Sequence, residues 1–169
     1  MIAGDATGDL ERRVWDALTR VHDPEIPGLD IVEMGVARQV AVGPDGRIEV
    51  VITPTYSGCP AMSVIAVDVG RALAEAGFAD AKVSLTHSPA WTTDWLTPGA
   101  RAKLAAQGIA PPVGTPGGRR ALFGEGPVVA CPQCGSRQTE RLAEFGSTAC
   151  KALYRCQACA EPFHYFKCV

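Results

Sequence analysis

The sequence has little excess charge of either sign. The chain of 169 residues carries 16 Lys and Arg residues against 18 Asp and Glu residues, a formal net charge of −2 at pH 7. A surface that binds nucleic acid or an acidic membrane normally shows as a basic excess. We therefore expect neither a nucleic-acid partner nor a membrane partner.

Long apolar runs are missing too. No segment approaches the roughly 20 apolar residues of a membrane span, and the opening stretch MIAGDATGDLERRVW lacks the basic and then apolar order of a secretory signal. A composition of 47% hydrophobic and 20% charged residues is typical of a folded globular chain. The sequence predicts a cytoplasmic globular protein.

Histidine is scarce, and its three residues lie far apart along the chain. The sequence also has no Rossmann glycine pattern, no P-loop and no carboxylate–histidine array of the kind that holds a di-iron centre. These absences argue against a nucleotide-binding or di-iron enzyme, and we expect a protein without catalytic residues of its own. A thiol enzyme that pairs Cys59 with His87 stays as an alternative.

Apolar periodicity and turn residues predict the order helix, strand, strand, helix, strand in the first part of the chain. The turn GPDG joins two alternating runs into a hairpin, and Gly77 ends the second helix. This order predicts an α+β fold, in which a small mixed sheet is covered by helices. The expected elements are helices at about 8–21, 61–76 and 98–107 and strands at about 36–42, 47–53 and 81–86.

The composition changes after residue 110. The stretch PPVGTPGGRRALFGEGP is rich in Gly and Pro, so we expect a first domain at 1–110, a linker at 111–127 and a second domain at 128–169. The second domain holds six of the seven cysteines, and it is too small to be stable through a hydrophobic core alone. It therefore needs a cross-link.

Two C-x-x-C motifs, CPQC and CQAC, supply that cross-link. They contribute Cys131, Cys134, Cys156 and Cys159, whose four thiolates can form the closed tetrahedron of a structural zinc site. The sequence predicts a zinc ribbon built of β-strands. An iron–sulfur cluster on the same ligands and a pair of redox-active dithiols stay as alternatives.

Cys59 lies in the stretch TPTYSGCPAM, between a strand and a helix. Pro60 suits the first position of a helix, so Cys59 is placed at the helix mouth, where the dipole favours negative charge. Cys59 is therefore a candidate for a lowered thiol pKa and for reactivity. The alternative is a small apolar side chain that fills a gap.

Cys150 and Cys168 flank the strands expected around the second C-x-x-C motif. Strand geometry places both thiols too far from the four-cysteine site to be its ligands. They could be packing residues or an adventitious disulfide. They could also form a second thiol site, together with Cys59.

The segments DPEIPGLDIVEMGV and TPTYSGCPAMSVI resemble the MIP18 family of iron–sulfur assembly domains. With CPQCGS, FGSTACKALYRCQAC and EPFHYFKC at its end, the whole chain is similar to the D-subunit family of bacterial 1,2-phenylacetyl-CoA epoxidase systems. In those systems of aerobic phenylacetate degradation, a multicomponent di-iron oxygenase epoxidises the aromatic ring of the CoA thioester.

The resemblance implies an accessory subunit that assists metal or iron–sulfur cluster maturation of the oxygenase or its reductase, which would be its partners. It implies that Cys59 is the reactive or cluster-handling thiol, with Asp23 and Glu25 of the acidic DPE loop nearby. A turn-forming role for these two carboxylates is equally open. A zinc-ribbon adaptor that only holds oxygenase and reductase together is the alternative function, and a homodimer stays open.

Overall fold

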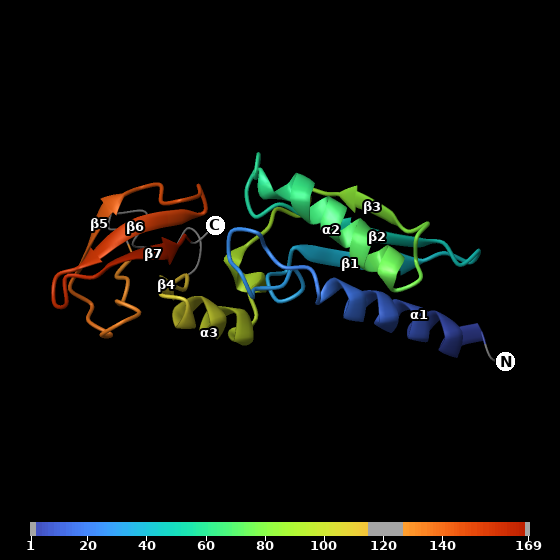
Figure 1. Cartoon of the computed structure of the whole chain (residues 1–169), viewed down its shortest axis with the longest axis horizontal. Coiled ribbons are helices and arrows are strands. Elements are labelled where there is room, and N and C mark those ends of the chain that lie inside the picture. The colour runs from blue at the N-terminus through green and yellow to red at the C-terminus, as the bar shows by residue number, and fades with distance from the viewer. Residues whose placement is uncertain (1–2, 115–126, 168–169) are drawn as a thin grey trace. The chain divides into compact units, whose positions relative to one another are not determined.

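The computed structural model describes residues 3–114 and 127–167. The chain divides into two compact units, Met1–Trp91 and Thr92–Val169. Figure 1 shows each unit as a small sheet with its own helices. Each unit is described by itself below.

The first unit is a three-stranded sheet with two helices. Strands β1 and β2 are antiparallel, and β2 and β3 are parallel, so α2 is the crossover between the last two strands. Helix α1 packs against β1 and against α2, and α2 packs against β3 (Figure 1). The elements are α1 (Ala3–Leu18), β1 (Ala37–Val42), β2 (Ile48–Ile52), α2 (Ala61–Glu75) and β3 (Lys82–Leu85).

Sequence periodicity explains these elements. On β2 the alternate residues Ile48, Val50 and Ile52 are buried, as expected for a strand with one covered face. The buried positions of α2 recur at helical spacing, and the helix is followed by the C-cap Ala76 and then by Gly77, whose φ of 92° favours glycine. The core of the unit lies between the sheet and the two helices.

The second unit is a four-stranded sheet in the order β4-β7-β6-β5. Strands β5, β6 and β7 are antiparallel neighbours, and β4 pairs with β7 in parallel. The elements are a short 3-10 helix η1 (Thr93–Trp95), α3 (Pro98–Ala106), β4 (Ile109–Ala110), β5 (Thr139–Ala143), β6 (Lys151–Cys156) and β7 (Pro162–Phe166).

The core of this unit is small and contains two of the cysteines. Tyr154 on β6 stacks on Phe163 with ring centroids 5.9 Å apart, and it meets Tyr165 edge to face at 5.5 Å. A core of this size contributes little stability on its own. Its members are Ala110, Val129, Cys131, Ala152, Tyr154, Cys156, Phe163 and Tyr165.

The structure confirms the expected fold class, the hairpin and the covered mixed sheet. The limits of one helix differ from expectation. Helix α1 begins at Ala3 and ends at Leu18, rather than spanning 8–21. The two units divide after Trp91, because β4 pairs with β7 and places α3 and β4 with the ribbon.

The domain limits of 1–110 and 128–169 stay a prediction, and most of the expected linker, residues 115–126, lies outside the described residues. None of the helices in residues 3–114 and 127–167 combines the length and the hydropathy that crossing a bilayer requires.

Candidate functional site

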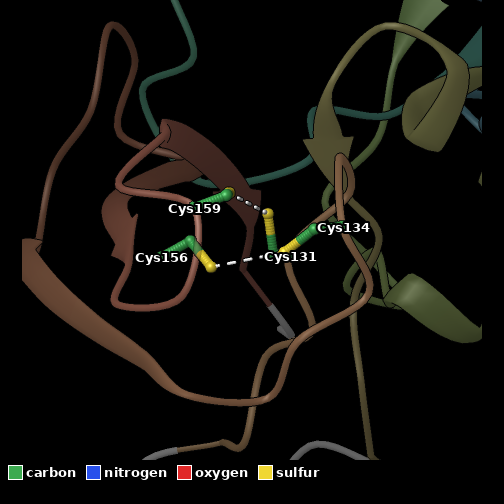
Figure 2. A group of neighbouring side chains, drawn as sticks. All are labelled: Cys131, Cys134, Cys156 and Cys159. Atoms are coloured by element: carbon green, nitrogen blue, oxygen red, sulfur yellow. Dashed lines mark hydrogen bonds between the residues drawn. The ribbon is translucent and has the colours of Figure 1, made fainter.

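The structure brings Cys131, Cys134, Cys156 and Cys159 together. Their Sγ atoms all lie within 4.8 Å of one another. Figure 2 shows the four side chains pointing toward one another from two turns, with Cys131 opposite Cys159 and Cys134 opposite Cys156. The Sγ–Sγ distances of these two pairs are 3.8 Å and 3.5 Å.

These distances fit a tetrahedral metal ion. Four thiolates that each lie about 2.3 Å from a central zinc are separated by about 3.8 Å from one another. The separations of the Cys131–Cys159 and Cys134–Cys156 pairs are close to that value, and all of the Sγ atoms lie within 4.8 Å of one another. The site can therefore hold a metal ion, which would join the two C-x-x-C turns.

Backbone N–H groups prepare the site for negative charge. The N–H groups of Cys159 and Ala158 donate to Cys156 Sγ and, with the Cys134 thiol, lower the pKa of Cys156 to about 6 against the effect of burial. The N–H of Glu161 acts to lower the pKa of Cys159, but the Cys134 thiol, burial and the thiols of Cys156 and Cys131 raise it to about 12. The backbone N–H groups around Cys156 thus favour its thiolate form, which is the form that binds a metal.

Cys59 lies at the mouth of α2, half-buried, directly before the N-cap residue Pro60. Gly58, whose φ of 83° favours glycine, turns the chain at that point. The helix has no side-chain cap and no acidic residue in its first turn. Its N-terminus and dipole therefore favour a bound anionic group at that point.

Thr53 is a residue that the sequence analysis did not single out. It follows β2, opens the loop that ends at Cys59, and is fully buried. Within the part of the chain that the structure describes, its Oγ1 has no hydrogen-bond partner. A buried hydroxyl without a partner is costly, so this loop has an unmet hydrogen-bonding requirement. The only local signal was a threonine directly after a strand.

Asp23 and Glu25 form a turn in the first unit. Asp23 is 9% exposed, and its Oδ1 accepts the N–H of Glu25 at 2.7 Å. The backbone of Asp23 also pairs with Leu29, at 2.9 Å. The turn-forming role is therefore real for Asp23, whereas a role of either carboxylate beside Cys59 stays a prediction.

Cys150 is half-buried and directly precedes β6, and its Sγ is 3.0 Å from Thr148 Oγ1. Cys168 lies outside the described residues, so the predicted second thiol site stays a prediction.

The loop before Cys150 is held against His164 of β7. The N–H of Ser147 donates to His164 Nε2 at 3.4 Å, and a Cβ added at Gly146 would lie 2.6 Å from His164 Cδ2. Burial, and next the charge of Lys151, lower the pKa of His164. The neutral imidazole is the form that can accept the Ser147 N–H.

Acidification is therefore expected to weaken the second unit through His164. A histidine whose folded pKa is lowered contributes stability that is fully present above its unfolded pKa of about 6.5 and is lost as the pH falls through the folded value. His164→Gln keeps a hydrogen-bond acceptor but does not titrate. In urea unfolding of the full chain between pH 7.5 and 5.5, the wild type should lose stability relative to this variant as the pH falls. A difference in unfolding free energy between the two proteins that stays constant with pH would contradict this expectation. Protonation of the four-cysteine site affects both proteins equally, so it cancels in the comparison.

Comparison with known families matches both units separately. A family model described as "Iron-sulfur cluster assembly protein" matches residues 11–85, and one described as "PaaD zinc beta ribbon domain" matches residues 115–167. The first match contains Cys59, Asp23 and Glu25. The second contains the four-cysteine site and Cys150.

Relatives extend these matches to nearly the whole chain. A protein of Escherichia coli strain K12 named for the D subunit of 1,2-phenylacetyl-CoA epoxidase is 46% identical over 92% of this chain and 92% of its own length. The Fe-S protein maturation auxiliary factor YitW of Bacillus subtilis strain 168 is 34% identical over 58% of this chain and 96% of its own length. The crystal structure of a domain of unknown function, DUF59, from Bacillus anthracis matches with a TM-score of 0.56 and 25% identity, over 60% of this chain and 96% of that one.

Proposed function

The chain belongs to the family of 1,2-phenylacetyl-CoA epoxidase D subunits, and on that premise we propose that it is an accessory protein that assists metal or iron–sulfur cluster maturation of the oxygenase or reductase component. The observation that carries the proposal is a thiol at an uncapped helix N-terminus, in a domain that matches an iron–sulfur cluster assembly family. The metal or cluster is cargo, and the epoxidase components are the partners.

The first unit supplies the cargo-handling chemistry in this proposal. A thiolate is the protein ligand that iron–sulfur clusters prefer. Cys59 is half-buried, so it is accessible enough to exchange a ligand with a partner. The N-terminus of α2 would stabilise the negative charge that thiolate ligands bring to a cluster.

The second unit supplies stability and a surface in this proposal. Zinc is the metal that best suits four thiolates in two C-x-x-C turns, and a bound zinc would cross-link a unit whose core is small. The match to a zinc ribbon family supports this choice over an iron–sulfur cluster on the same ligands. In this proposal the site stabilises the fold of the second unit and takes no part in loading the partner proteins.

Deletion of the protein tests the proposal. In a strain that lacks it, the purified oxygenase and reductase should be folded but should contain much less iron than those from the parent strain, because no factor loads them. Iron content and visible absorption of the purified components give the answer. Normal iron content in the deletion strain would overturn the proposal.

The zinc-ribbon adaptor remains the competing function. Two large apolar side chains on the second unit, Leu142 and Phe145, are 48% and 64% exposed and favour a binding role for that unit. An adaptor predicts fully metallated components that fail to associate with each other when the chain is absent. Copurification of oxygenase with reductase in the deletion strain separates the two functions.

A further inference from the structure

The four cysteines do not share one environment. Cys131 and Cys156 are 2% and 0% exposed and belong to the apolar core of the second unit. Cys134 and Cys159 are exposed. A metal ion on these ligands would therefore be anchored from the core side by one cysteine of each turn and be open to solvent on the side of the other two.

The two exposed cysteines also differ in the residue that follows each of them. The residue after Cys134 is Gly135, with φ of 74°, and the residue after Cys159 is Ala160, with φ of 64°. A left-handed conformation carries little cost for glycine and a clear cost for a residue with a Cβ. The two turns thus share one shape, which is relaxed in CPQCG and strained in CQACA.

The turn around Cys159 is also the more exposed of the two. Residues 157–161 are all exposed, whereas Pro132 and Ser136 in the first turn are half-buried. Pro132 fixes a backbone angle there, and the N–H of Gly135 closes the turn on the carbonyl of Cys131 at 2.9 Å.

We propose that Cys159 is the ligand that leaves the metal first, so that metal exchange at the four-cysteine site begins at the second turn. An incoming thiol loses its proton and forms a bond to the metal as the bond between the metal and Cys159 breaks. The released Cys159 thiolate takes up that proton. No oxidant or reductant is needed. Release of Cys159 lets Ala160 leave the left-handed region, which favours opening at this turn.

Timed alkylation of the Zn²⁺-loaded full chain with iodoacetamide tests the order. A thiolate that has left the metal displaces iodide and is recorded by peptide mass spectrometry. Cys159 should be modified before Cys134, and both before Cys131 and Cys156. Modification of Cys134 at the same rate as Cys159, or of all four together, would overturn the proposal.

Two matched variants separate backbone strain from simple exposure. Ala160→Gly should slow the modification of Cys159 and the release of Zn²⁺ to a chromogenic chelator by about fivefold, the factor expected from relief of a left-handed non-glycine residue. Gly135→Ala should place the same strain beside Cys134 and raise its rate by a similar factor. Both variants are expected to bind one Zn²⁺ per chain, and an unchanged Cys159 rate in Ala160→Gly would contradict the proposal.

Discussion

Removal of the metal is expected to unfold the unit Thr92–Val169 while the unit Met1–Trp91 stays folded. The free energy of metal binding to a structural four-ligand site is on the order of 10 kcal/mol, whereas a core of this size supplies about 3–5 kcal/mol. Two members of that core, Cys131 and Cys156, are themselves metal ligands. Without the metal, the four thiols do not cross-link the two turns. They also contribute less to the stability of the unit than larger apolar side chains would.

The indole N–H signals of two tryptophans report on the two units separately. Trp91 in the first unit donates its Nε1–H to the carbonyl of Met34 at 2.9 Å, and Trp95 lies in the second unit. On titration of the full chain with a chelator, the Trp95 signal should move to its unfolded position while the Trp91 signal stays. Cys131→Ser should behave like the chelated protein and Cys150→Ser like the wild type. Retention of a folded second unit after complete metal removal would contradict this expectation.

Replacement of Cys59 by serine is expected to abolish maturation without unfolding the protein. The half-buried side chain changes by one atom, so the loss of stability should be small. The loss of metal affinity should be large, since removal of even an outer partner of a metal ligand lowers affinity by about 10–100-fold. The iron content of the oxygenase or reductase from cells with Cys59→Ser should therefore fall at least about tenfold.

Cys150→Ser is the matched control for this experiment. Cys150 is also half-buried but lies in the second unit, directly before β6. Cells that carry it should yield fully loaded components. A normal iron content of the oxygenase and reductase in cells with Cys59→Ser would show that Cys59 has no role in maturation. The adaptor function, in which Cys59 is only a packing residue, would then be favoured.

Local sequence patterns were sufficient for the first unit and for the metal turns. Alternation on β2, helical spacing on α2 and glycine at position 77 are short-range signals that the structure reproduces. The paired C-x-x-C motifs indicated four neighbouring thiols for the same reason, because each turn brings its own two cysteines together.

Features that depend on distant contacts were not predictable. The two residues of β4 are a strand only because they pair with His164 and Tyr165 of β7, and β5 has a mostly polar sequence that carries no strand signal. The early start of α1 at Ala3 lies in a segment without apolar periodicity. The unpartnered hydroxyl of Thr53 and the left-handed Ala160 are properties of the folded backbone.

Anaerobic reconstitution tests the maturation role of Cys59 most directly. The wild-type chain and Cys59→Ser are each incubated with Fe²⁺ and sulfide, passed through a desalting column, and assayed for iron, acid-labile sulfide, zinc and visible absorption. The account predicts that the wild type retains iron and sulfide in addition to the metal of the four-cysteine site, and that Cys59→Ser retains that metal alone. Equal iron and sulfide in the two proteins would contradict it.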